Sequence, residues 1–257
     1  YSSFIHLLLQ AHPQAAKVFY VVGKAFGEYV FSRYRSATKR NDRKLVDFCF
    51  DELAVLGLGS VRIGPGAASQ SILVKVFKSP CSTYLKKALG ICRRRVDDFH
   101  AGYLAGVFSS YHQNNYEFEE TRCQLEGTDY CLFKGRPVPE KQPELMARVR
   151  KEVVVENIEY EDISDHARNN MVDRIAKSSV LTLDDGQLKL FNVLIAVFPL
   201  SLFHVLQRQL HEHHIPFESL LFHSTLMQSM RACGYQEERF GVKKKEEILS
   251  KVLEQWE

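Results

Sequence analysis

The spacing of apolar residues changes near Gly57, and this change limits the folds that the chain can adopt. Before it, apolar residues recur at steps of three and four, as at Val18, Phe19, Val22, Phe26 and Val30. This period predicts amphipathic helices within residues 1–56. After it, segments 60–63 and 71–77 are rich in Val, Ile and Leu and flank Gly64-Pro65-Gly66, which predicts a β-hairpin. The chain is therefore expected to be of the α+β class.

The central part of the chain continues with helices and strands. Helices are expected at 45–56, 83–89 and 98–111, and strands at 116–125 and 130–134. The helix at 98–111 carries large apolar residues on one side and small residues on the other, namely Ala101, Gly102, Ala105 and Gly106. Small side chains let a second backbone approach closely, so this side is expected to face another part of the backbone.

A second hairpin is expected nearer the C-terminus. Residues 180–183 and 188–191 flank Asp184-Asp185-Gly186, and Asp-Gly suits a tight turn. A strand at 193–198 and helices at 200–210, 217–232 and 244–254 follow, while the charged region 148–174 is expected to hold one strand and one helix.

Composition and charge exclude several classes of protein. The chain is 45% hydrophobic and 25% charged, which is typical of a globular protein and excludes disorder. Its formal net charge of +3 is nearly balanced, so neither nucleic acid nor a membrane surface is required as a partner. The apolar run 193–203 is about half of the ~20 residues that a membrane span needs. Six cysteines are too few for a disulfide scaffold, which favours a cytoplasmic protein with thiols free for metal binding.

Glu120, Cys123 and Cys131 form the most specific polar pattern in the sequence. An antiparallel hairpin with its turn near Gly127 can place the two cysteines opposite each other. Glu120 and Cys123 are three residues apart, so on a regular strand they would point to opposite faces, and a bulge or strong twist is needed to bring both to one ion. Two thiolates and a carboxylate suit zinc. By spacing alone, a pair of half-buried strand cysteines is an equally open interpretation.

Three segments resemble the 4-vinyl reductase domain family. They are the run Asp97-Asp-Phe-His-Ala-Gly-Tyr-Leu-Ala-Gly106, Glu119-Glu-Thr-Arg-Cys123, and Gly127-Thr-Asp-Tyr-Cys-Leu-Phe133. That family includes sensor domains of aromatic-responsive bacterial transcription activators and archaeal hydrocarbon-binding proteins, and its fold is related to that of the TRAPP subunits. The resemblance is specific over residues 97–133 and extends over 1–137. It implies a twisted antiparallel sheet that is covered by helices on one face.

The resemblance also implies a set of metal ligands. Aromatic-sensing members of the family hold a structural zinc with Cys, Glu, Cys and Cys, and the last three match Glu120, Cys123 and Cys131. The first ligand position falls on Asp97, which departs from the family pattern. An aspartate can ligate zinc, although a harder oxygen ligand weakens the selectivity of a thiolate site. His100 and Cys92 are nearby alternatives.

The resemblance further divides the chain into three parts. Residues 1–137 are expected to form a 4-vinyl reductase-like domain that lacks its opening strands, and residues 138–179 a linker and helix. Residues 180–257 resemble the opening half of a second unit of this kind, because a hairpin, an apolar strand and a helix pair follow in order. The tail is therefore either a partial second copy or a complement of the first domain.

The function that these features favour is a sensor rather than an enzyme. The domain would bind a small apolar or aromatic ligand between helices and sheet, act as a homodimer, and make no direct contact with nucleic acid. Candidate ligand-binding residues are Phe19, Phe26, Phe99, Tyr103 and Val107. For each of these residues, plain core packing is the alternative.

Two other functions stay open at this stage. A TRAPP-like assembly scaffold would need no diffusible ligand, and an enzyme related to a tetrapyrrole vinyl reductase would need a nicotinamide or flavin motif that the sequence lacks. The histidines of 211–214 are expected to lie at a solvated helix end, although His211 and His214 would share a helix face if the helix continued. The basic runs 93–95 and 243–245 are expected to be solvated.

Overall fold

The computed structural model describes residues 12–64, 71–91, 95–139, 143–153, 181–184, 186–190, 193–195 and 200–216. The chain divides into two compact units, Tyr1–Ile215 and Pro216–Glu257, and nearly all of the second lies outside the described residues. The expected helices at 217–232 and 244–254 also lie outside them, as does the segment 1–11. The division into 1–137, 138–179 and 180–257 stays a prediction.

Two helices at the start of the described chain follow the predicted helical period. Helix α2 spans Ala15–Thr38 and α3 spans Arg43–Val55. The apolar stripe of α2 is buried, including Phe19, Phe26 and Val30. Lys39 ends α2 in the left-handed region, with φ at 55°, and its N–H donates to the Arg35 carbonyl at 2.8 Å. A charged turn then leads into α3.

The strands expected at 60–77 and at 116–134 pair into one antiparallel sheet. Its strands are β1 (Ser60–Ile63), β2 (Ile72–Phe77), β3 (Tyr116–Arg122) and β4 (Tyr130–Pro137), in the order β1-β2-β4-β3. β3 is shorter than the predicted 116–125, because the 3₁₀ turn η1 (Gln124–Glu126) replaces its last residues. The α+β class is confirmed.

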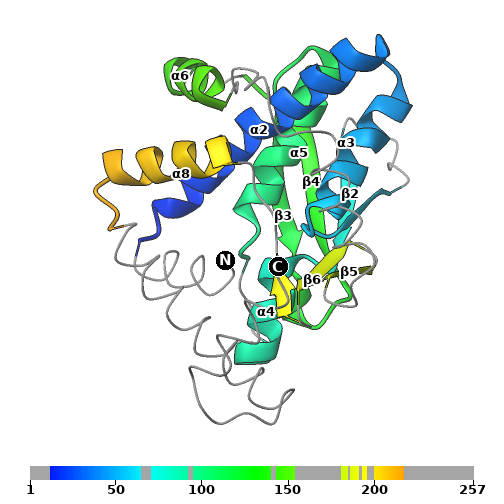
Figure 1. The fold of residues 1–257 in the computed structure, drawn as a ribbon, viewed down its shortest axis with the longest axis vertical. Helices are drawn as coiled ribbons and strands as arrows, with labels where there is room; N and C mark the ends of the chain where they lie inside the picture. The colour runs from blue at the N-terminus through cyan, green and yellow to red at the C-terminus, as the bar shows by residue number, and fades with distance from the viewer. Residues whose placement is uncertain are drawn as a thin grey trace, which may run out of the picture. The chain divides into compact units, whose positions relative to one another are not determined.

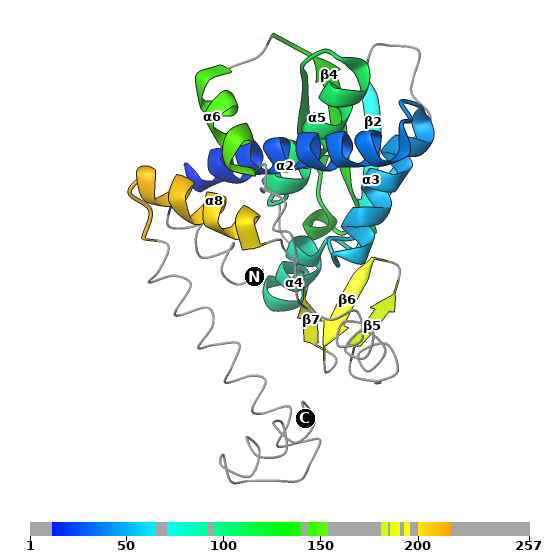
Figure 2. The same cartoon turned by 45° about the horizontal axis from the view of Figure 1, so that its top comes forward.

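Helix α5, Asp98–His112, is the centre of this unit. It lies between α2 and the sheet (Figure 1, Figure 2). Every residue from Phe99 to Phe108 is buried. Helix α4, Pro80–Leu89, begins with proline in its first turn, where the missing N–H costs nothing, and precedes α5 along the chain.

Glycines on both helices bring the backbones of α2 and α5 together. A Cβ atom added at Gly102 or Gly106 would overlap the carbonyl oxygen of Tyr20 or Lys24, both on α2. In return, a Cβ at Gly23 of α2 would overlap the Phe99 carbonyl of α5. The small-residue side of α5 therefore faces another backbone closely, as the sequence predicts, and that backbone is helix α2.

The remaining described elements are α6 (Pro143–Val153), a three-stranded antiparallel meander and α8 (Leu200–Glu212). The meander consists of β5 (Leu181–Asp184), β6 (Gln187–Leu190) and β7 (Val193–Ile195). The charged region 148–174, expected to hold one strand and one helix, is helical up to Val153, where α6 presents an apolar stripe that includes Met146 and Val149, and its remaining residues lie outside the described ones. Among the described helices, none is long and apolar enough to cross a membrane.

Candidate metal centre and ligand pocket

Four side chains that are distant in sequence converge near the start of α5. One ligand atom from each of Asp97, Glu120, Cys123 and Cys131 lies within 4.8 Å of the other three, and all four residues are buried. They come from the residue before α5, from β3, from the end of β3 and from β4. These residues are the ligands predicted from the sequence, and we call them the four-residue cluster.

An irregularity in β3 brings Glu120 and Cys123 to one face. Glu120 is opposite Phe133 and Arg122 is opposite Leu132, so Thr121 is an extra residue on β3. An extra residue in one strand reverses the alternation of faces, and two side chains three positions apart then point the same way. Cys123 thereby comes to 3.8 Å from Cys131, measured between the two Sγ atoms. The required bulge is present.

The Glu120 carboxylate is only half satisfied by the protein. Its Oε2 accepts hydrogen bonds from the backbone N–H groups of Val96 at 2.9 Å and Asp97 at 3.2 Å. Its Oε1 is buried and has no hydrogen-bond partner among the described residues. Burial, followed by the nearby Asp97 and Cys123, raises the pKa of Glu120 to about 10. A buried carboxylate oxygen without a partner is costly, and a cation at this point would remove that cost.

Asp97 is held by donors from two other segments. Ser79 donates to Oδ1 at 2.9 Å and Ser82 donates to Oδ2 at 2.7 Å. His100 lies 3.5 Å from Oδ1 through Nδ1, while its Nε2 is 2.7 Å from the Leu58 carbonyl oxygen. Burial alone would raise the pKa of Asp97. The hydrogen bond and charge of His100, together with the hydrogen bonds from Ser82 and Ser79, lower that pKa overall. The carboxylate is thus kept charged and oriented inside the protein.

The two thiols lie next to the same serine. Ser82 Oγ is 3.4 Å from Cys123 Sγ and 3.3 Å from Cys131 Sγ. The hydrogen bond with Cys131 lowers the pKa of Cys123 to about 7, whereas burial raises the pKa of Cys131. One thiol of the pair is therefore ready to act as a thiolate ligand, which is the form that binds metals.

The donor set fits a borderline divalent cation. Two sulfurs and two carboxylates in a buried, closed group match the ligands of a structural zinc site. The unsatisfied Glu120 oxygen is the observation of this structure that favours an ion. His100 does not join the cluster but orients Asp97, and Cys92 lies outside the described residues.

Ser79 and Ser82 belong to the candidate site through their hydrogen bonds to Asp97, and the sequence did not indicate them. The sequence gives little sign of this role, because a serine followed by proline, as at Ser79-Pro80, is a common way for any helix to begin. In the structure no side chain caps the start of α4, and both hydroxyls turn to Asp97 instead.

The predicted ligand-binding residues pack against one another. Phe19, Phe26, Phe99, Tyr103 and Val107 are all buried between α2, α5 and their neighbours. The ring centroid of Phe26 is 5.7 Å from that of Tyr103 and 6.4 Å from that of Phe99. The Tyr103 hydroxyl donates to the Cys49 carbonyl at 2.7 Å. In this conformation they form core, and their role with a ligand stays a prediction.

A small gap beside these residues adjoins the cluster. It has a volume of about 10 Å³ and is lined by Phe19, Leu58, Val96, Phe99 and His100, together with Pro80, Cys81, Asp97 and Asp98. That volume is at the lower limit for one water molecule. Asp97 belongs to both the gap and the cluster.

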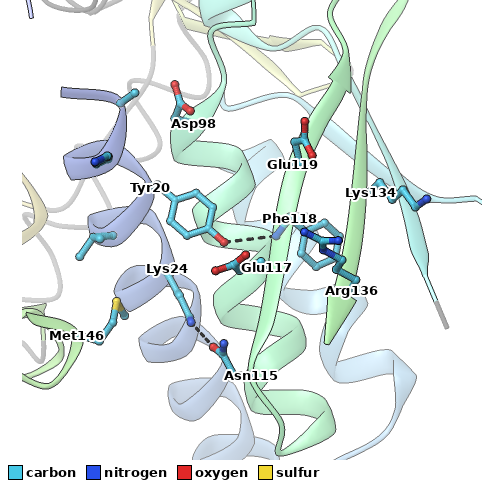
Figure 3. A pocket seen from close by; sticks show the side chains of 13 residues that line it. Tyr20, Lys24, Asp98, Asn115, Glu117, Phe118, Glu119, Lys134, Arg136 and Met146 are labelled. Carbon is cyan, nitrogen blue, oxygen red and sulfur yellow. Dashed lines mark hydrogen bonds between the residues drawn. The ribbon is translucent and has the colours of Figure 1, made fainter. Parts of the chain in front are cut away.

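A larger cavity of about 680 Å³ opens between α2 and the edge strand β3 (Figure 3). Helix α6 also borders it, and its lining includes Tyr20, Lys24, Glu117 and Met146. The Phe118 N–H donates to the Tyr20 hydroxyl at 3.3 Å across it, and Lys24 donates to Asn115. None of the five predicted apolar ligand residues lines this cavity. Its charged lining suits a polar molecule better than a hydrocarbon.

The other candidate residues lie apart from the cluster. Helix α8 ends at Glu212, and His214 has a φ of 56°, so His211 and His214 do not share a helix face. Both histidines are exposed. Of the basic run 93–95, Arg95 is described; it is exposed and lies 2.9 Å from Glu119.

Residues 88–137 match the model of the 4-vinyl reductase domain. This match confirms the resemblance to the 4-vinyl reductase domain family over the segment that contains all four cluster residues. No curated protein matches the chain.

Solved structures with some likeness to the chain come from three kinds of protein. The phenol-responsive sensory domain of the transcription activator PoxR with phenol is 13% identical, with a TM-score of 0.44 over 58% of this chain and 79% of that one. A vinyl-4-reductase family protein from Methanocaldococcus jannaschii is 18% identical, with a TM-score of 0.37 over 47% and 68%. Trafficking protein particle complex subunit 3 from Naegleria fowleri, covalently bound to palmitic acid, is 13% identical, with a TM-score of 0.38 over 53% and 90%.

Proposed function

We propose that this chain is a regulatory domain in which a metal ion fixes the end of the β3–β4 hairpin beside a binding site for a small apolar or aromatic molecule. The observation that carries the proposal is the four-residue cluster with its unpartnered Glu120 oxygen. The family match over residues 88–137 supports the same interpretation.

Zinc is the ion that the donor set favours. When bound, it would supply the positive charge that balances thiolate and carboxylate groups in a buried site. Asp97 would tie the start of α5 to the ion, while Glu120, Cys123 and Cys131 would tie the hairpin to it. Ser79, Ser82 and His100 would hold Asp97 in place, as partners behind metal ligands commonly do.

The proposed ligand site is the gap next to Asp97. Its lining of Phe19, Leu58, Val96 and Phe99 is apolar, with the His100 ring at one side. Because about 10 Å³ holds no organic molecule, the ligand would bind a conformation in which these side chains have separated. A ligand that binds this open conformation more tightly shifts the population toward it. The shared Asp97 would carry that shift to the metal centre.

A regulatory role fits the burial of the cluster better than catalysis does. The four ligand residues are at most 5% exposed, so a substrate has no direct path to them. His100 uses both ring nitrogens in contacts with Leu58 and Asp97, which makes it a structural group.

Metal analysis tests the first part of the proposal. The purified chain is expected to contain one zinc, and Cys123→Ser and Cys131→Ser are each expected to lose it. Cys49→Ser is the matched control, because Cys49 is also a buried free thiol but lies on α3. Zinc that remains at full stoichiometry in the two cluster variants would contradict the site.

Ligand screening tests the second part. Phenol, toluene and naphthalene serve as probes in native mass spectrometry and thermal-shift measurements. Val96→Phe adds bulk beside the gap and is expected to abolish binding, whereas Val21→Phe, which lines the larger cavity, is expected to keep it. Loss of binding only in Val21→Phe would place the ligand in the larger cavity instead. A metal-containing oligomer that takes none of the probes would favour an assembly scaffold.

A further inference from the structure

The face of the four-stranded sheet that points away from α5 concentrates positive charge. Along each strand, side chains alternate between two faces, and Val74, Val76, Cys131 and Phe133 are buried on the inner face. The residues between them point outward. These outward positions carry five cations from all four strands, which we call the outer cations: Arg62, Lys75, Arg122, Lys134 and Arg136.

Two of the outer cations lie opposite carboxylates, since strand register pairs Arg136 with Glu117 and Lys134 with Glu119. None of the five forms an ion pair with a described residue, whereas Arg33, Arg43 and Arg148 elsewhere in the described chain do. The outward acidic residues on these strands are Glu117 and Glu119, and Glu119 is already paired with Arg95 at 2.9 Å. A chain of net charge +3 thus presents an excess of positive charge on one face.

Strand register arranges part of this charge in a row. Arg62 is opposite Lys75, Lys75 is opposite Leu132, and Leu132 is opposite Arg122. Because neighbouring strands are about 4.8 Å apart, the row crosses the sheet over about 14 Å. Lys134 and Arg136 continue the charge along β4, and both also line the larger cavity that Figure 3 shows.

Two aromatic rings lie next to this row. Phe77 and Tyr130 are opposite each other on β2 and β4, with ring centroids 5.6 Å apart, and both are half-buried. Arg62 lies over the Phe77 ring at 5.2 Å and Lys75 over the Tyr130 ring at 4.4 Å. Each ring is therefore at the surface with a cation beside it.

We infer that this face binds single-stranded nucleic acid. Cations that alternate with flat aromatic surfaces match a polymer that alternates phosphates with bases, because the cations attract phosphate while the rings stack on bases. A four-stranded sheet is too wide to enter the groove of a duplex, which favours a single strand. A membrane is the weaker match, since Phe77 and Tyr130 are half-buried and pack against each other.

The expectation of no nucleic-acid contact rests on the nearly balanced net charge and on basic runs, 93–95 and 243–245, that are expected to be solvated. The outer cations could not be recognised in the sequence, because they are spread over residues 62–136 and strand pairing alone assembles them. This inference uses no residue of the four-residue cluster, so it stands or fails independently of the proposed function.

Fluorescence anisotropy of the full chain with a labelled 12-nucleotide poly-U strand tests the inference. The double variant Arg62→Glu/Lys75→Glu is expected to bind at least tenfold more weakly. The control Arg35→Glu/Lys44→Glu makes the same charge change on exposed α2 and α3 positions and is expected to stay within twofold. Tyr130→Ala, with its fold checked by circular dichroism, is expected to cost fivefold or more. The salt dependence should flatten by about 0.7 in log–log slope for each phosphate contact removed.

Three results would overturn the inference. The first is equal weakening in the control double variant, which would make the binding a consequence of net charge. The second is a duplex of equal length that binds as tightly as the single strand. The third is binding to vesicles of 3:1 phosphatidylcholine and phosphatidylserine without binding to poly-U, which would assign the face to an anionic membrane.

Discussion

Helix α5 has two parts with opposite surroundings. Its middle, around Gly102 and Gly106, packs backbone to backbone against α2 and is complete as it stands. Its beginning, at Asp97 and His100, is surrounded by buried polar groups, and the Glu120 oxygen among them has no partner in the described chain. The first part is filled by the chain's own atoms, whereas the second holds a buried Glu120 oxygen for which the described chain supplies no partner.

This contrast separates the fold from the functional site. Close packing of glycines contributes through many weak contacts, and nothing in solution is needed to complete it. A buried carboxylate without a partner lowers stability until a partner is supplied. The predictions below set the two parts of α5 against each other.

The largest effect is expected from closing the space between α2 and α5. Gly102→Ala places a methyl group into the Tyr20 carbonyl of a neighbouring helix, and overpacking of this kind is expected to cost about 3 kcal/mol. Urea unfolding measures the change. Gly64→Ala is the control, because its added Cβ would make only ordinary contacts, 3.5 Å from the Leu73 carbonyl oxygen, and its cost should be under about 1 kcal/mol. Equal costs at the two glycines would show that the α2–α5 packing is not tight.

Removal of the metal is expected to destabilise the beginning of α5 and the four-residue cluster, but not the middle of α5. A chelator should lower the free energy of unfolding by about 3–4 kcal/mol if zinc is present at several hundred times its dissociation constant. Hydrogen exchange should then increase at amides near the cluster, such as Gln124, more than at those in the middle of α5. In Cys131→Ser the chelator should change nothing. Uniform loss of protection from exchange along α5 would show that its two parts unfold as one cooperative unit.

Glu120→Gln is expected to have different effects on the two states. In the metal-free protein the raised pKa of Glu120 keeps it protonated at neutral pH, and a glutamine amide resembles that neutral acid, with an oxygen that still accepts from Val96 and Asp97, so stability should change by less than about 1 kcal/mol. Zinc affinity should fall at least tenfold, because an amide is a poorer ligand than a carboxylate. Calorimetric titration and thermal unfolding give the two numbers. A clear loss of stability in both states would mean that Glu120 is purely structural.

Ser82→Ala is expected to give the smallest effect. It removes one hydrogen bond to Asp97 and two contacts to sulfur, which should cost about 1 kcal/mol. The Co²⁺-substituted protein should keep its thiolate charge-transfer band but show altered d–d bands, because Asp97 would be less firmly oriented. Ser36→Ala, at an exposed position of α2, serves as a control outside the cluster. Unchanged spectra would show that Ser82 only packs beside the cluster and does not orient Asp97.

The main elements and the identity of the cluster residues follow from the sequence without any structure. Apolar periods predicted α2, α3, α5 and the hairpins, because burial of one face imposes 3.6-residue or two-residue spacing whatever the tertiary arrangement. The small residues of α5 predicted the close approach of another backbone. Asp97, Glu120, Cys123 and Cys131 were predicted together because they lie in segments that resemble one family.

The way in which these residues are used depends on tertiary contacts. The bulge at Thr121 aligns Glu120 with Cys123, and the hydroxyls of Ser79 and Ser82 hold Asp97, because contacts between distant segments depend on strand register and helix placement rather than on local pattern. The same holds for the outer cations, which become one surface only when four strands pair. Spacing along a chain specifies periods, while the direction of each side chain in space is set by the partners that the fold brings to it.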